Sequence, residues 1–226
     1  MNAINLANSG LYSIGDASAL TGVSQQRVRG WLNGYSKPNG GKTRPRLSGQ
    51  IKPIENKYAL GFLDLMELHF ISHFLKVGVK WSTLKIAAIN ARNFFKIDHP
   101  FATKFISDGL AIFEETAKET GDLQLCDLVN KQYAMYSVLQ PALKKGIIFD
   151  KNGYATSWHP SERLDQIILD PKRSFGQPII DNYSVPTRTI FEAYEAEGSI
   201  KEVSALYEIP ETYAQQAIEF ERAMRK

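Results

Sequence analysis

The sequence predicts a mainly α-helical protein with short β-hairpins, organised as an N-terminal winged helix-turn-helix, a mixed α/β middle segment and a C-terminal three-helix unit. Three observations lead to this fold class. Apolar residues recur at helical spacing over much of 12–95. Turn-forming Asp-Gly and Asn-Gly pairs occur at 108–109 and 152–153, and Gly198 and Pro210 divide the C-terminal end into short helical stretches. The expected regions are 1–98, 99–163 and 164–226.

The composition, with 43% hydrophobic and 23% charged residues among 226, is that of a soluble globular protein. The sequence has no apolar run approaching about 18 residues, and its N-terminus lacks the charge and apolar core of a signal peptide. We therefore expect a cytoplasmic protein that does not engage a membrane. The single cysteine, Cys126, excludes an intrachain disulfide and is expected to be a buried thiol.

The stretch from Tyr12 to Tyr35 has helix-turn-helix patterning. Thr21-Gly22 separates two short helices, and Ser13 and Ser24 stand where N-cap hydroxyls would satisfy free backbone N–H groups. One buried face is expected to contain Ile14, Ala17, Leu20, Val23, Val28 and Trp31.

The polar side of the second helix carries candidate DNA contacts. Amide side chains pair with adenine and guanidinium groups with guanine in the major groove, and a helix start can insert there. The candidates are Ser24, Gln25, Gln26, Arg27 and Arg29. The alternative is an ordinary three-helix packing unit with solvated polar residues, because this core serves many purposes besides DNA binding.

Residues 36–46 are too rich in proline, glycine and charge for a helix and predict a wing loop. In a winged helix, Lys42, Arg44 and Arg46 would meet backbone phosphates beside the recognition helix. The alternative is a flexible linker.

Charge is distributed unevenly along the chain, although the overall net charge is only +3. Residues 1–60 contain eight basic and two acidic residues, whereas 187–226 contain five basic and eight acidic residues. The N-terminal end therefore suits a polyanion, and the C-terminal end suits a protein partner better than DNA.

Two amphipathic helices are expected at 59–77, ended by Gly78, and from a Ser82 cap to about Phe95. His69 and His73 lie four residues apart, a spacing that can hold a metal ion from one helix face. Because the sequence offers no cysteine or third histidine nearby, we expect packed histidines, no metal and no cofactor.

The middle segment predicts two hairpins and a helix. Asp108-Gly109 is expected to join strands at 104–107 and 110–113, and 150–153 to join strands at 147–149 and 154–156. A helix is expected over 123–144, with Pro141 near a kink. This segment shows no catalytic residue set, so an enzyme is not expected.

The C-terminal end predicts short extended pieces between Ile168 and Thr187. Three helices follow, at about 186–196, 199–207 and from 211 to the end, with Ser199 and Glu202 forming a capping box. This unit is acidic and is expected to bind protein.

From Tyr12 to about Ala88 the chain resembles the DNA-binding domain of the MerR family. The resemblance is carried by Tyr12-Ser13-Ile14, Leu20 to Ser24, Arg29 with Trp31, the wing, and Val77-Gly78-Val79. It implies a dimer on operator DNA, contacted through Gln25, Gln26, Arg27 and Arg29. The long dimerisation helix and cysteine ligands common in that family are not found here, which disfavours metal or drug sensing.

The C-terminal stretch resembles a domain family of unknown function that recurs in VapB-type antitoxins. The resemblance is carried by Leu169-Asp170-Pro171, Gly176 to Ile180, Val185-Pro186-Thr187, and Gly198 to Val203. Many members have Gly-Thr-Arg before the proline, whereas Asn182-Tyr183-Ser184 stands here, so no role of that arginine carries over.

Together the two resemblances imply an antitoxin of a type II toxin–antitoxin system. Such a protein would neutralise a PIN-type ribonuclease toxin, bind operator DNA and repress its own operon as a homodimer. The first alternative is a MerR-like transcriptional regulator whose residues 60–160 bind a small effector. The second is an enzyme using His69, His73 and a carboxylate around a metal.

Overall fold

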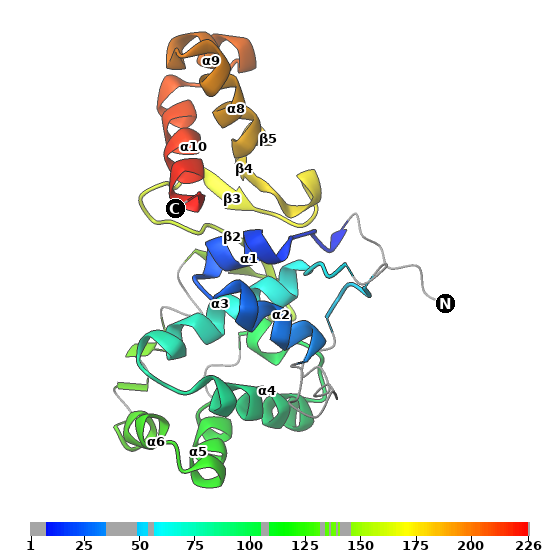
Figure 1. Cartoon of the computed structure of the whole chain (residues 1–226), viewed down its shortest axis with the longest axis vertical. Helices are drawn as coiled ribbons and strands as arrows, with labels where there is room; N and C mark the ends of the chain where they lie inside the picture. The colour runs from blue at the N-terminus through cyan, green and yellow to red at the C-terminus, as the bar shows by residue number, and fades with distance from the viewer. Residues whose placement is uncertain are drawn as a thin grey trace.

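Helices form most of the described chain, and five short strands form one small antiparallel sheet (Figure 1). The computed structural model describes residues 8–34, 49–53, 57–104, 109–131, 134–135, 137–138, 140 and 146–225. The predicted fold class, mainly α-helical with short β elements, is confirmed. Within these ranges, every helix is too short or too polar to cross a bilayer.

Two helix pairs form the N-terminal part, as the apolar periodicity predicts. Their bounds are α1 (Ile14–Thr21), α2 (Gln25–Asn33), α3 (Phe62–Lys76) and α4 (Trp81–Phe95). α1 packs against both α2 and α3. Just ahead of α1, Tyr12 forms an antiparallel bridge with Leu60, which ties the start of the helix-turn-helix to the segment that leads into α3.

The predicted hairpin around Asp108-Gly109 is wrong for its second strand, because that segment begins helix α5 (Gly109–Thr120). The buried side chains of α5 are Ile112, Phe113, Thr116 and Ala117. Their spacing places them on one face of a helix, and burial of this face outweighs the local turn signal. The first predicted strand, 104–107, lies outside the described residues except for Lys104.

Two further helix predictions need correction. Ser82 lies inside α4, and Lys80 is the N-cap. The helix predicted over 123–144 is interrupted, because α6 (Leu123–Asn130) ends before Lys131, whereas the described residues 134–135, 137–138 and 140 are again helical. The residues after α6 are described only in part.

The sheet is an antiparallel meander in the order β1-β2-β3-β4-β5. The strands are β1 (Ile147–Phe149), β2 (Ala155–Trp158), β3 (Ile167–Leu169), β4 (Pro178–Ile180) and β5 (Val185–Pro186). β1 and β2 pair with Ile147 opposite Trp158, which confirms the predicted hairpin at 147–156. β2 and β3 pair through Trp158 and Leu169, so the sheet links the middle segment to the C-terminal unit.

The C-terminal unit contains the three predicted helices, α8 (Thr187–Glu197), α9 (Ile200–Tyr207) and α10 (Glu211–Met224). Gly198 ends α8 in the left-handed conformation, and the Ser199 hydroxyl accepts a hydrogen bond from the backbone N–H of Glu202. The three helices pack on one another, and α8 and α10 also pack against β4, with α9 at the end of the unit farthest from α1 (Figure 1).

Two hydrophobic cores hold the described chain together. The larger core spans the N-terminal and middle segments and includes Trp31, Phe70, Phe113 and Trp158. The smaller core fills the C-terminal unit and includes Ile180, Ile190, Val203 and Ile218. Leu20 of α1 packs against both cores, so the helix-turn-helix directly contacts the C-terminal unit.

A short turn fixes the C-terminal unit against the start of α1. The Tyr12 hydroxyl, which is buried, donates a hydrogen bond to the carbonyl oxygen of Gly176 at 2.8 Å, and the N–H of Leu11 donates to the Phe175 carbonyl at 2.8 Å. Gly176 has a φ of +80°, and a Cβ there would lie 2.5 Å from the Tyr12 hydroxyl. Only glycine therefore fits this close approach.

Replacing Tyr12 with phenylalanine is expected to lower the free energy of unfolding by about 1–3 kcal/mol, because the buried Gly176 carbonyl then lacks its donor. Urea denaturation of both proteins measures the difference. Tyr58→Phe is the matched control, since its hydroxyl contacts Asn33 at a partly exposed position. Equal stabilities of wild type and Tyr12→Phe would show that this hydrogen bond does not stabilise the junction.

Candidate nucleic-acid interface

The turn between α1 and α2 is set by short side-chain and backbone contacts. Ser13 and Asp16 form a reciprocal capping box at the start of α1. Gly22 ends α1 in the left-handed conformation, and the Thr21 hydroxyl donates to the Ala17 carbonyl and accepts from the Val23 N–H. Two helices are thereby joined by a three-residue connection, as the sequence predicts.

The candidate DNA-contact residues of α2 lie on its solvent side. Ser24, Gln25, Gln26, Arg27 and Arg29 are all exposed, whereas Val28, Trp31 and Leu32 are buried. Ser24 precedes the helix but makes no side-chain capping bond. The predicted contact residues therefore remain available to a ligand.

The exposed residues of α2 do not all share one face. An α-helix turns about 100° per residue, so Gln25, Gln26 and Arg29 lie together on the side away from Trp31. Arg27 lies on the flank, with its guanidinium carbon 5.9 Å from the centre of the Trp81 ring on α4. This distance is within the range of a cation–π contact. Of the candidate DNA contacts, Gln25, Gln26 and Arg29 thus share one exposed face, and Arg27 lies beside them.

The predicted wing, with Lys42, Arg44 and Arg46, lies outside the described residues. Its expected phosphate contacts therefore stay predictions. The chain is described again from Gly49, where the backbone N–H of Gln50 donates to the Asp64 carboxylate on α3 at 2.9 Å. The segment that follows the predicted wing is anchored by this contact.

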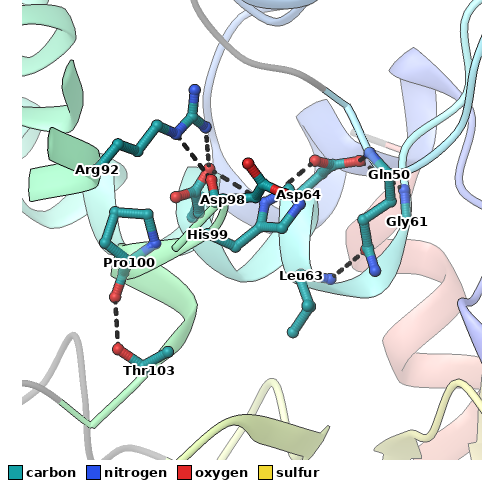
Figure 2. A network of polar contacts seen from close by, with 10 residues as sticks. Gln50, Gly61, Leu63, Asp64, Arg92, Asp98, His99, Pro100 and Thr103 are labelled. Atoms are coloured by element: carbon teal, nitrogen blue, oxygen red, sulfur yellow. Dashed lines mark hydrogen bonds and ion pairs between the residues drawn. The ribbon is translucent and has the colours of Figure 1, made fainter. Parts of the chain in front are cut away.

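A buried polar cluster, made of Asp64, Glu67, Arg92 and His99, joins α3 to α4 and to the loop before η2 (Pro100–Ala102) (Figure 2). Asp64 and Glu67 are fully buried. His99 Nδ1 lies 3.5 Å from a carboxylate oxygen of each. Arg92 Nη2 lies 3.3 Å from Glu67 Oε2, and Arg92 Nε donates to the Asp98 carbonyl at 2.7 Å.

The cluster also positions the backbone that leads into α3. Asp64 Oδ2 accepts the N–H groups of Gln50 and Gly61, each at 2.9 Å, and the Gln50 side chain accepts the Leu63 N–H (Figure 2). The segment at Gln50 and the start of α3 thus meet at one carboxylate. The arrangement fixes the described segment at Gln50 relative to α3.

Burial and charge alter the protonation of this cluster. Burial raises the pKa of Asp64 to about 6, although the positive charge of His99 acts to lower it. Burial acts to lower the pKa of His99, but the neighbouring carboxylates of Glu67 and Asp64 outweigh it and raise the pKa above its usual 6.5. The guanidinium of Arg92 and the proton that His99 holds more tightly both oppose the negative charge of the neighbouring carboxylates.

The raised pKa of His99 predicts that the free energy of unfolding falls as pH rises. The folded state holds the His99 proton more tightly than the unfolded chain does. The stabilisation that comes from this proton is therefore complete below pH 6.5 and is lost as pH rises through the raised pKa of the folded state. Denaturation at about pH 6.5 and about pH 8.5 measures the change. His99→Asn should lose most of this pH dependence, and an unchanged slope in that variant would contradict the assignment.

His69 and His73, the predicted metal candidates, pack against each other and against the core. Their ring centroids are 4.8 Å apart, and His69 lies 4.4 Å from the Trp158 ring. Burial lowers the pKa of His69 to about 3, so its imidazole is neutral. Among the described residues, no group of three or more histidine, cysteine, aspartate or glutamate side chains could hold a metal ion.

A cleft of about 1250 Å³ separates α1 and the start of α2 from α8 and α10. Gln25 lines one side of it, together with Asp16, while Glu192, Glu195 and Glu221 line the other. The first residue of the candidate DNA-binding helix therefore lines a cleft whose C-terminal side carries three carboxylates and the two guanidinium groups of Arg188 and Arg225.

Sequence reasoning did not identify the buried cluster or the cleft. One signal for the cluster was present, because Asp64 and Glu67 are acidic residues three positions apart in an apolar helix. The position of His99 beside them gave no such signal. The cleft depends on how the C-terminal unit packs against α1, which spacing along the chain does not encode.

A comparison with family models finds one match in the C-terminal part of the chain. Residues 167–220 match the family described as "Protein of unknown function (DUF433)". The match runs from β3 into α10 and therefore covers most of the smaller core.

The chain is also similar to proteins of Mycobacterium tuberculosis over most of its length. It is 20% identical over 210 residues to the protein named "Putative antitoxin VapB45", covering 87% of each chain. The crystal structure of Rv2018 superposes with a TM-score of 0.68 at 17% identity, covering 92% of this chain and 96% of that chain, and shows the same fold. The family match and the VapB45 similarity support a relationship to antitoxin-like proteins.

Proposed function

We propose that this protein is the antitoxin of a type II toxin–antitoxin system, a regulatory protein rather than an enzyme. The observation that carries the proposal is the similarity to the protein named VapB45, which extends over 87% of both chains. It therefore extends well beyond residues 167–220, the part that matches the family of unknown function. The predicted cytoplasmic location fits this role.

The proposed DNA contact is the exposed face of α2 formed by Gln25, Gln26 and Arg29. Two amides and one guanidinium on adjacent positions provide donors and acceptors for base edges in the major groove. Arg27 beside them, and the predicted wing residues Lys42, Arg44 and Arg46, would contact phosphates. One helix reads few base pairs, so a homodimer on an inverted repeat is expected.

The proposed protein partner is a ribonuclease toxin of the PIN type, held by the C-terminal unit of the chain. The end from 187 to 226 contains eight acidic and five basic residues, which disfavours DNA there and favours a protein surface. Such a toxin is expected to use a carboxylate cluster with Mg²⁺, and the antitoxin to block that site with a basic side chain. The wild-type chain is expected to bind the toxin without DNA.

Co-expression with the product of the neighbouring reading frame tests the proposal. We expect the two proteins to co-purify, the neighbouring product alone to cleave RNA and arrest growth, and this chain to reverse both effects. A reporter driven by the upstream region should also be repressed by this chain. A neighbouring product without ribonuclease activity, together with an unrepressed reporter, would contradict the proposal.

The second candidate is a MerR-like regulator that responds to a small effector. The cleft beside Gln25 favours it, because a ligand bound there would touch α1, the start of α2, α8 and α10. This cleft lies outside the 60–160 segment in which the sequence predicts an effector. The candidate predicts that a small molecule, rather than a protein, changes the affinity for the upstream DNA.

A further inference from the structure

We infer that the acidic face of α8 weakens DNA binding by α2, through Glu192 and Glu195 acting across the cleft from Gln25. The inference rests on the proposed role of α2 in DNA binding and concerns how that binding is regulated. It places carboxylates of the C-terminal unit beside the first residue of the candidate DNA-binding helix.

The geometry places the acidic residues beside the part of α2 that would enter DNA. Recognition helices contact base edges mainly through their N-terminal residues, and Gln25 is the first residue of α2. Gln25, Glu192 and Glu195 line the same cleft. A duplex seated on the start of α2 would therefore run close to α8.

The two sides of the cleft are fixed relative to each other. Tyr12 donates its hydroxyl hydrogen to Gly176, Leu11 donates its N–H to Phe175, and Leu20 packs against the C-terminal core. α1 also contacts α10. The acidic face is thus held near α2 by the fold and does not depend on a mobile connection.

Carboxylates outnumber guanidinium groups in the cleft lining. The lining contains the carboxylates Asp16, Glu192, Glu195 and Glu221 and the guanidinium groups of Arg188 and Arg225, so two negative charges are in excess. Of the four carboxylates, only Asp16 lies on the α1 side. Arg188 is tied to Glu192 at 2.7 Å, and Arg225 lies over the Phe191 ring at 4.0 Å.

Glu192 and Glu195 are the exposed acids on the α8 side. DNA carries one negative charge per about 1.7 Å of helix axis. Carboxylates within about a Debye length, roughly 8 Å at physiological salt, repel these phosphates. Glu192 also forms an ion pair with Arg188. This pair competes with any contact between the Arg188 guanidinium and a phosphate. Neutralising both glutamates removes two repulsive charges, and it also removes the ion pair between Glu192 and Arg188.

The test compares Glu192→Gln/Glu195→Gln with wild type by fluorescence anisotropy on a labelled duplex from the sequence upstream of the protein's own reading frame. The matched control is Glu208→Gln/Glu211→Gln. It changes net charge equally, but at the connection between α9 and α10, the end of the unit far from α2 (Figure 1). All four positions are exposed, so the fold is expected to persist.

We expect the cleft variant to bind about 3–10-fold more tightly than wild type at physiological salt, with the control close to wild type and the difference shrinking at high salt. Equal affinities of wild type and the cleft variant would overturn the inference while leaving the proposed function standing. Equal gains in both variants would show a net-charge effect and would also overturn it. Failure of all three proteins to bind at low salt would overturn the proposed function and the inference together.

Discussion

Replacing Arg92 with methionine is expected to lower the free energy of unfolding by about 3–5 kcal/mol. Arg92 and His99 balance the charges of Asp64 and Glu67, both of which are fully buried. Without the guanidinium, His99 alone faces two carboxylates, and the buried cluster carries an excess negative charge. The loss of the Arg92 hydrogen bond to the Asp98 carbonyl adds to this cost. Denaturant unfolding followed by circular dichroism measures the change.

Two controls separate this effect from loss of packing. Glu67→Gln/Arg92→Met removes the cation together with one buried anion, so it should be more stable than Arg92→Met alone. Lys131→Met breaks an exposed pair with Asp127 and should change stability by less than about 1 kcal/mol. If Arg92→Met unfolds at the same denaturant concentration as Lys131→Met, the buried pair does not stabilise the fold.

Replacing Arg29 with alanine is expected to weaken binding to the upstream duplex by about 1–3 kcal/mol and to reduce discrimination against a scrambled duplex. Arg29 is exposed on the same face of α2 as Gln25 and Gln26, so its guanidinium is placed to reach a base edge. Because the side chain contributes nothing to the core, the variant should unfold like wild type. Anisotropy titrations on both duplexes give the two affinities.

Arg27→Ala provides the comparison, because Arg27 lies on the flank of α2 over Trp81. A phosphate contact there would weaken binding to the upstream and scrambled duplexes by the same factor. If Arg29→Ala also acted equally on both duplexes, the assignment of base reading to this face of α2 would be wrong.

The local features of the helix-turn-helix could be predicted from the sequence. Ser13 caps α1, and Ala17, Val23, Val28 and Trp31 are buried, as their spacing indicates. These outcomes depend on residues within one or two helical turns, where the physical rules are local. The hairpin at 147–156 could be predicted for the same reason.

Competing local signals explain the incorrect hairpin at 104–113. Asp108-Gly109 predicts a tight turn, but Ile112, Phe113, Thr116 and Ala117 also have helical spacing. In the folded protein these four side chains are buried together in α5. Tertiary burial therefore decided between two local preferences that the sequence alone left unresolved.

From the charge distribution along the sequence, we expected the basic N-terminal end to bind DNA and the acidic C-terminal end to bind a protein. The fold instead brings Gln25 to the same cleft as Glu192 and Glu195. This contact depends on the Tyr12–Gly176 junction, which joins residues far apart in the chain. Charge counts along a sequence do not reveal that Gln25 and these glutamates line one cleft, because they do not show which surfaces lie beside each other in the fold.

The most direct test of the central claim, that α2 reads operator DNA, is a titration of the wild-type protein against its upstream duplex and a scrambled duplex of equal length at physiological salt. The account predicts that the upstream duplex binds at least about 1,000-fold more tightly. Equal affinity for the two duplexes, or no binding to either, would contradict it.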